Sequence, residues 1–168
     1  ALANGQGIIA KSLSRIAKKK MADKSPEEQE QFVKSVVDSI HVTTDAAKAV
    51  ESTDLVIEAI IENMKIKKEL FSFLDSKAPA GAIFASNTSS LSISEVASAT
   101  KREDRFGGFH AFNPVPQMKL IEIVRTSQTS PETHETLVEV AKRMGKVPVS
   151  CKDSPGFIVN RLLVPYQL

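Results

Sequence analysis

Apolar residues recur along this chain with two alternating periodicities. A spacing of three or four positions, typical of an amphipathic helix, occurs in four long segments. These predicted helices span 9–21, 26–40, 66–74 and 137–144. Compact apolar runs bounded by turn residues predict five strands. These span 55–61, 82–85, 105–112, 119–125 and 147–151.

Shorter signals complete the expected order of elements. They predict a strand at 40–43, a helix from 45 to 50, a helix capped by Ser92 and a last helix opened by Ser154 and Pro155. Ser25 followed by Pro26 is typical of a helix start and marks where the second long helix begins. Proline has no backbone N–H to donate, so Pro165 should kink or stop the last helix.

The alternation of strands and helices predicts an α/β fold. Strands that follow one another through helices favour an open, Rossmann-like, mostly parallel sheet with helices on both faces. The run at 55–61 is apolar apart from Glu58, as expected for a strand buried on both faces of such a sheet. The adjacent strands 105–112 and 119–125 predict an antiparallel or mixed addition at one edge.

Polar residues follow three of the predicted strands directly. They are Glu62-Asn63, the segment 87–90, and the segment 110–113. In open α/β sheets, ligands bind at the carboxyl ends of the strands. These three polar clusters therefore predict one binding site, although the fold alone does not define the reaction.

The strongest chemical signal is the pair His110 and Glu122. Both faces of its predicted strand are apolar except for Glu122, so this carboxylate should be shielded from water and needs a partner. His110 ends the neighbouring strand between Phe109 and Phe112. A carboxylate that holds one imidazole nitrogen fixes the tautomer and suits the other nitrogen to removing a proton from an alcohol. The alternative is a structural histidine near an unrelated glutamate, and the spacing alone does not decide between them.

The string GQGIIA at 5–10 matches the dinucleotide fingerprint G-x-G-x-x-A. That fingerprint binds pyrophosphate only where it follows a strand and opens a helix. No strand is predicted before Gly5. We therefore interpret this match as coincidental.

Composition narrows the class of protein. The net charge of +2 does not call for nucleic acid or an anionic membrane as partner, and no apolar run reaches membrane-spanning length. The single cysteine, Cys151, excludes a disulfide framework and is interpreted as a buried structural thiol. The three histidines lack ligand spacing, so no metal site is expected.

Four longer motifs stand in order along the chain. They are FASNTSSL at 84–91, GFHAFNPVP at 108–116, MKLIEI at 118–123 and KDSPGFIVNR at 152–161. Together they resemble the L-3-hydroxyacyl-CoA dehydrogenase family over essentially the whole chain. The strings IAKKK at 16–20 and RLLVPY at 161–166 are most similar to its short-chain mitochondrial members from animals.

The resemblance implies NAD-dependent oxidation of the 3-hydroxyl of an acyl-CoA in mitochondrial fatty-acid β-oxidation, by a homodimer. The implied catalytic residues are the base His110, its partner Glu122, and Ser89 and Asn160, which hold the substrate oxygen. The implied cofactor contacts are Ala59, Glu62, Lys67, Asn87, Ser89 and Asn113. The implied contacts with the CoA substrate are Ser12, Lys19 and Ser89.

Relative to that family, both ends of the chain are expected to be truncated. Residues 1–152 would form a partial NAD-binding domain without its first strand and glycine-rich turn. Residues 153–168 would form the first helix of a helical C-terminal domain. The 168 residues alone are therefore expected to turn over poorly.

Other interpretations remain open at the level of sequence. Ser89, His110 and Glu122 could form a serine hydrolase triad, but the G-x-S-x-G elbow is absent. A non-catalytic CoA- or NAD-binding or crystallin-like relative is the alternative from another class. Taken singly, Ser89 could be a helix cap and Asn113 a turn residue.

Overall fold

The computed structural model describes residues 2–167. These residues divide into two compact units, with the division after Ala46. The first unit is a helical hairpin, and the second contains a five-stranded sheet.

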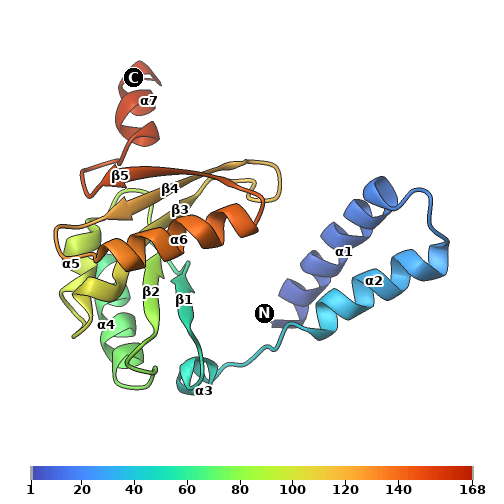
Figure 1. The fold of residues 1–168 in the computed structure, drawn as a ribbon, viewed down its shortest axis with the longest axis horizontal. Coiled ribbons are helices and arrows are strands. Elements are labelled where there is room, and N and C mark those ends of the chain that lie inside the picture. The colour runs from blue at the N-terminus through green and yellow to red at the C-terminus, as the bar shows by residue number, and fades with distance from the viewer. Residues whose placement is uncertain (1, 168) are drawn as a thin grey trace. The chain divides into compact units, whose positions relative to one another are not determined.

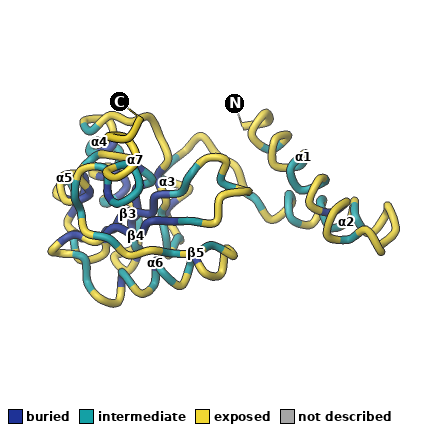
Figure 2. Tube along the Cα trace, turned by 90° about the horizontal axis from the view of Figure 1, so that it is seen from above, coloured by how far each residue is buried: buried dark blue, intermediate teal, exposed yellow. Residues whose placement is uncertain are grey.

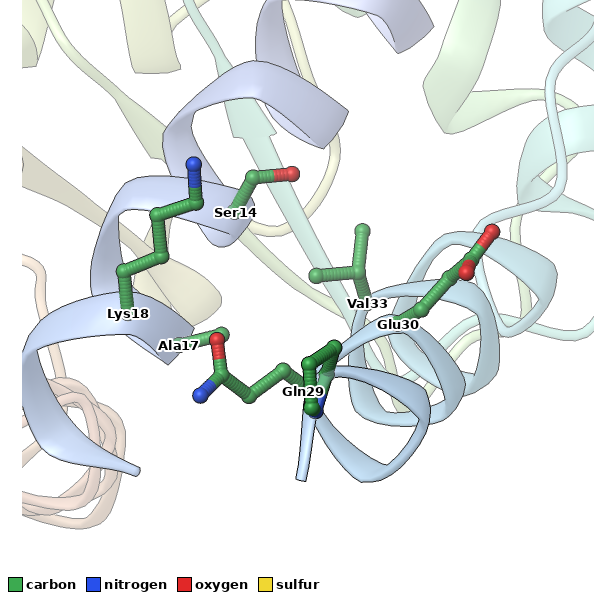
Figure 3. Close-up of a pocket in the computed structure, with 7 residues that line it drawn as sticks. Ser14, Ala17, Lys18, Gln29, Glu30 and Val33 are labelled. Atoms are coloured by element: carbon green, nitrogen blue, oxygen red, sulfur yellow. The ribbon is translucent and has the colours of Figure 1, made fainter. Parts of the chain in front are cut away.

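The hairpin consists of α1 (Leu2–Lys20) and α2 (Pro26–Asp38). Ser25 caps α2 as predicted, in a capping box with Glu28. The side chain of Gln29 donates to the carbonyl of Met21 at 2.9 Å and ties the turn to the second helix. A cleft of about 390 Å³ lies between the two helices. Figure 3 shows the residues that line it, with Ser14 and Lys18 on one side.

Two predictions for this unit have clear outcomes. The string at 5–10 lies inside α1, so the interpretation that it is not a phosphate-binding turn is confirmed. The predicted strand at 40–43 is wrong, because this segment is irregular and largely exposed. A strand needs a neighbour for its backbone hydrogen bonds, and the described sheet begins only at β1.

The second unit begins within the short helix α3 (Ala46–Val50) and contains one sheet. Its strands are β1 (Leu55–Glu58), β2 (Ile83–Ser86), β3 (Phe106–Ala111), β4 (Leu120–Arg125) and β5 (Val147–Lys152). They lie side by side in chain order, and β1, β2 and β3 are parallel. β4 is antiparallel to β3 and parallel to β5, which confirms the mostly parallel sheet with a mixed edge.

Helices cover both faces of the sheet (Figure 1). On one face, Leu137 and Ala141 of α6 (Pro131–Arg143) pack against Phe109, Ile121 and Ile123. The opposite face packs on α4 (Met64–Asp75) and α5 (Ile93–Ala97). There Phe71 of α4 contacts the rings of Phe84 and Phe106 at 5.6 and 4.7 Å between centroids.

Glycines allow α6 and β4 to approach β3 closely. A Cβ on Gly107 would lie 2.6 Å from Leu137 of α6, and one on Gly108 would lie 2.7 Å from Val124. The 3₁₀ helix η1 (Glu103–Arg105) leads directly into this strand. Figure 2 shows that buried residues concentrate on β3 and β4, in the middle of the sheet.

Three predictions for the sheet unit need correction. β1 is not buried on both faces, because Ile57 is 41% exposed on this edge strand of the described sheet. The last helix, α7 (Val159–Gln167), begins four residues after Pro155, because Gly156 and Phe157 adopt left-handed conformations. α7 also continues through Pro165, so this residue does not stop the helix, and the alternative, a kink at Pro165, stays a prediction.

Candidate functional site

The centre of the site is a buried pair on adjacent antiparallel strands. His110 of β3 and Glu122 of β4 stand directly opposite each other in register and are 3% and 1% exposed. The Nδ1 atom of His110 lies 2.7 Å from Oε2 of Glu122. An ionised carboxylate can only accept hydrogen bonds, so this contact places the imidazole proton on Nδ1 and leaves the lone pair on Nε2.

The second oxygen of Glu122 is held by the chain that leads into α7. Oε1 accepts hydrogen bonds from the backbone N–H groups of Ile158 and Val159, at 3.0 and 2.8 Å. With His110 on Oε2, the carboxylate therefore has three donors from two segments far apart in sequence. This arrangement compensates for its removal from water.

Aromatic rings enclose the imidazole. The ring of Phe112 lies 4.4 Å from that of His110, and the ring of Phe157 lies 5.6 Å away, measured between centroids. Phe157 is itself buried. The His110–Glu122 contact is consequently dry, which strengthens the electrostatic interaction between the two groups.

A further contact brings Ser89 and Asn160 together. The side-chain amide of Asn160, in the first turn of α7, donates to the backbone carbonyl of Ser89 at 3.1 Å. Asn160 directly follows Val159, whose N–H binds Glu122. The four residues predicted as catalytic therefore belong to one connected group around the start of α7. Among the described residues, no hydrogen bond joins the Ser89 hydroxyl to His110, as a serine hydrolase triad would require.

The carboxyl ends of β1 and β2 carry a buried ionic network. Lys67 of α4 is 0% exposed, and its Nζ donates to Oε1 of Glu58 at 2.7 Å and to the carbonyl of Ile60 at 3.4 Å. The hydroxyl of Ser86 donates to the other oxygen of Glu58 at 2.6 Å. A buried charge of each sign is thus paired and hydrogen-bonded, as stability requires.

Glu62 links this network to the loop after β2. One oxygen lies 3.5 Å from Nζ of Lys67, and the other accepts from the Thr88 hydroxyl at 2.5 Å and the Ser89 N–H at 3.0 Å. Burial by itself would raise the pKa of Glu62, but these hydrogen bonds and the Lys67 charge hold the pKa below its usual value. The Glu62 side chain remains 41% exposed, so an ionised carboxylate faces solvent at the strand ends.

Asn87 joins the same edge to β3. Its side-chain oxygen accepts from the N–H of Ala111 at 2.8 Å, immediately after His110. Its own N–H donates to the carbonyl of Glu58 at 2.8 Å. Three successive strand ends are therefore connected by side chains, as the positions of the polar clusters predicted.

Four predicted site residues make none of the contacts described above. Ala59 and Asn113 are exposed, on the loops after β1 and β3. Ser12 and Lys19 lie on α1, within the separate hairpin unit. Their roles remain predictions.

Two residues of the network were not predicted, namely Glu58 and Ser86, and Thr88 was predicted only as part of the polar segment 87–90. Glu58 did carry a signal, because a charge inside an apolar strand requires a partner. The sequence does not reveal that the partner is Lys67, nine positions away on the next helix.

Two further observations concern other kinds of site. Among residues 2–167, no cluster of three or more His, Cys, Asp or Glu side chains could hold a metal ion. None of the helices in the described part of the chain combines the length and apolar composition that crossing a bilayer needs.

The sheet order, the helices on both faces and the polar strand ends define a dinucleotide-binding domain of the Rossmann type. Comparisons with known proteins agree. The family described as 3-hydroxyacyl-CoA dehydrogenase, NAD binding domain, matches residues 1–154. The chain therefore belongs to the 3-hydroxyacyl-CoA dehydrogenase family and carries its NAD-binding domain, with NAD as the cofactor.

Individual relatives show the extent of the similarity. The mitochondrial hydroxyacyl-coenzyme A dehydrogenase of Sus scrofa is 58% identical over 99% of this chain, and that of Homo sapiens is 56% identical. The crystal structure of (S)-3-hydroxybutyryl-CoA dehydrogenase PaaH1 from Ralstonia eutropha superimposes with a TM-score of 0.87 over 99% of this chain, at 40% identity, and the match covers 56% of that structure. The match covers 53% of each mammalian protein, so the chain spans about half the length of these relatives.

Proposed function

We propose that the full-length protein interconverts L-3-hydroxyacyl-CoA and 3-ketoacyl-CoA with NAD. One observation carries this proposal, namely the dry contact of 2.7 Å between His110 and Glu122. A histidine whose Nδ1 is held by a carboxylate has its Nε2 free to take a proton. Oxidation of an alcohol requires such a base, and the names of the relatives indicate hydroxyacyl-CoA compounds as substrates.

In this proposal, Nε2 of His110 removes the proton from the 3-hydroxyl of the substrate. When bound, NAD supplies the acceptor for the hydride that leaves the carbon bearing this hydroxyl. Glu122 keeps the imidazole in the required tautomer and stabilises the positive charge that the ring acquires. Ser89 and Asn160 hold the substrate oxygen beside the ring.

The strand ends suit a dinucleotide chemically. The exposed, ionised carboxylate of Glu62 can accept hydrogen bonds from ribose hydroxyls. Four further residues follow the ends of the parallel strands β1, β2 and β3 and are proposed to contact the cofactor there, namely Ala59, Asn87, Ser89 and Asn113. Lys67 is buried with its ammonium directed at protein oxygens, so we propose that it acts on the cofactor through Glu62. Ser12 and Lys19 of the hairpin are proposed to contact the CoA portion, where a cation suits phosphate.

Other features of the proposal come from the relatives. The mammalian relatives are named mitochondrial, and we propose the mitochondrial matrix and fatty-acid β-oxidation as the setting. We also propose a homodimer, and a boundary after residue 152 between the NAD-binding domain and a helical domain. The family match, which ends at residue 154, supports that boundary.

The test is an absorbance assay at the nicotinamide band with the full-length protein. We expect oxidation of NADH with acetoacetyl-CoA and reduction of NAD with short- and medium-chain 3-hydroxyacyl-CoA. Absence of turnover with all of these substrates, with NAD binding retained, would instead favour a non-catalytic binding protein. Hydrolysis of an ester substrate without NAD would favour the serine hydrolase alternative.

A further inference from the structure

Two consecutive residues before α7 adopt left-handed backbone conformations. Gly156 has φ of 72° and Phe157 has φ of 50°. Phe157 is the one residue other than glycine with a positive φ among the residues that the structure describes. The left-handed region is unfavourable for a residue with a Cβ. The surrounding structure must therefore hold Phe157 in this conformation.

The contacts around the two residues show what holds them. The N–H of Phe157 donates to the carbonyl of Ser154, and the N–H of Arg161 donates to the carbonyl of Gly156, both at 2.9 Å. A Cβ on Gly156 would lie 2.9 Å from the Arg161 nitrogen, so only glycine fits this position. The ring of Phe157 is buried beside the imidazole of His110.

The left-handed pair determines where the following backbone points. The next two N–H groups, of Ile158 and Val159, both donate to one oxygen of Glu122. The other oxygen of the same carboxylate is thereby left facing Nδ1 of His110. A regular helix starting at Pro155 would use these N–H groups for its own i to i−4 hydrogen bonds.

We infer that Gly156 and Phe157 are positioning residues for the His110–Glu122 pair. In this inference they act through Glu122 and not on the substrate or the cofactor. They direct two N–H groups at Glu122 and so hold its carboxylate in the orientation that fixes the imidazole. This inference rests on the proposed function and adds residues to which the comparisons assign no role.

The first test is kinetic, on the full-length protein. Gly156→Ala should lower kcat about 10- to 100-fold, because a small displacement of a catalytic group is costly, while the KM for NAD stays within about twofold. In a protein that already carries Glu122→Gln, Gly156→Ala should lower kcat by less than about twofold. Coupled residues show such non-additivity, whereas a general loss of structure would be additive.

A second pair of variants separates the effect of the Phe157 backbone conformation from the effect of its ring. Asparagine tolerates the left-handed region and valine does not. Phe157→Asn should therefore retain more of the wild-type kcat than Phe157→Val. Phe71→Leu, a buried phenylalanine of α4 away from the pair, is the matched control, and its effects should add to those of Glu122→Gln.

A spectroscopic measurement tests the inference without turnover. The Nδ1 proton of His110, in a short hydrogen bond to a carboxylate, should give a far-downfield proton resonance, assigned by its loss in His110→Gln. Gly156→Ala should move this resonance upfield or abolish it, and Phe71→Leu should leave it in place.

The outcomes distinguish this inference from the proposed function. An unchanged resonance in Gly156→Ala, or additive losses of kcat, would overturn the positioning role. A wild-type protein without NAD-dependent turnover would contradict the proposed function, while the shift of the resonance would still decide whether the turn orients Glu122.

Discussion

Buried polar side chains in this protein are each tied to a specific partner. Glu122 binds one imidazole and two backbone N–H groups, and Lys67 binds Glu58. An unpaired buried charge would cost several kcal/mol, so each of these groups depends on its neighbours. Changing one partner should consequently affect function or stability in a specific way.

Removal of the proposed base gives the most direct prediction. His110→Gln in the full-length protein should lower kcat roughly 10²- to 10⁴-fold, the usual effect of losing an acid–base group. Steady-state kinetics with acetoacetyl-CoA measures it. His134→Gln is the matched control, because His134 of α6 binds Ser150 on β5. A His110→Gln variant with normal kcat would remove His110 from the mechanism.

Replacement of its partner should affect the same step. Glu122→Gln should lower kcat while the dissociation constant for NAD, measured by fluorescence titration, changes little. The amide cannot stabilise an imidazolium as a carboxylate does, yet it preserves the shape of the side chain. An equal loss of NAD affinity would show that Glu122 has a structural role instead.

Cys151 provides a prediction on pH dependence. Burial, with the nearby charges of Glu122 and Asp153, raises the pKa of this thiol to about 11. Since only the thiolate reacts, alkylation of Cys151 by iodoacetamide at pH 8 should be roughly a hundredfold slower than that of a free cysteine. Peptide mass spectrometry measures the rate. Glu122→Gln removes one of the charges and should accelerate the reaction; an unchanged or lower rate would contradict this cause.

At the scale of elements, α5 depends on a residue sixty positions away in the chain. The carboxylate of Asp153 accepts from the N–H groups of Ile93 and Ser94 at 3.0 and 2.8 Å and from the hydroxyls of Ser92 and Ser94. The helix is only five residues long, so this cap satisfies much of its N-terminus.

Loss of this cap should destabilise the fold. Burial by itself would raise the pKa of Asp153, but the hydrogen bonds from Ser94, Ile93 and Ser92 hold it below its ordinary value of 3.8. The ionised carboxylate of Asp153 therefore stabilises the fold above pH 3.8. This contribution to stability is lost as the pH falls through the lowered pKa of Asp153. Asp153→Ala should cost about 1 kcal/mol at pH 7, and the difference from wild type should shrink at pH 3.

Urea unfolding at both pH values measures this difference. Asp104→Ala is the control, because the Asp104 side chain is exposed and forms a surface ion pair with Arg105. Its effect should stay below about 0.5 kcal/mol. An Asp153→Ala effect of the same size in acid and at neutral pH would contradict the charged cap.

The close approach of β3 and β4 gives another prediction at this scale. A Cβ on Gly108 would lie 2.7 Å from the Cβ of Val124 and 3.1 Å from Ile93. Gly108→Ala should therefore destabilise the fold by about 1 to 3 kcal/mol, as overpacking does. Gly7→Ala in α1, where a Cβ meets nothing within 4 Å, should instead stabilise by about 0.5 to 1 kcal/mol. Thermal unfolding of both variants checks the two signs.

The type of element was predictable where an apolar pattern is long, as in α4, α6, β3 and β4. The wrongly predicted strand at 40–43 shows that a short apolar pattern does not suffice. Such a run becomes a strand only if a partner strand lies beside it. The start of α7 was also mispredicted, because the helix-start signal of Ser154 and Pro155 does not reveal the left-handed turn that follows.

At the scale of the whole molecule, the chain consists of two compact units joined by an exposed segment around 41–45. Exposed irregular segments are the preferred sites of proteolysis. Thermolysin, which cleaves before large apolar residues, should first cut before Ile40 or Val42 in the full-length protein. Limited digestion followed by mass spectrometry identifies the site. A first cut within the loops of the sheet unit would contradict the expected order.

The sequence by itself determined the α/β class and the sheet with its mixed edge, and it identified His110 and Glu122 as candidates for a pair. These depend on local periodicity and on the cost of burying a charge, which can be read from neighbouring residues. Only the tertiary structure decided that Lys67 binds Glu58, that Asp153 caps α5 and that the backbone before α7 holds Glu122. Such partners are brought together by the packing of helices on the sheet, and no spacing along the chain encodes them.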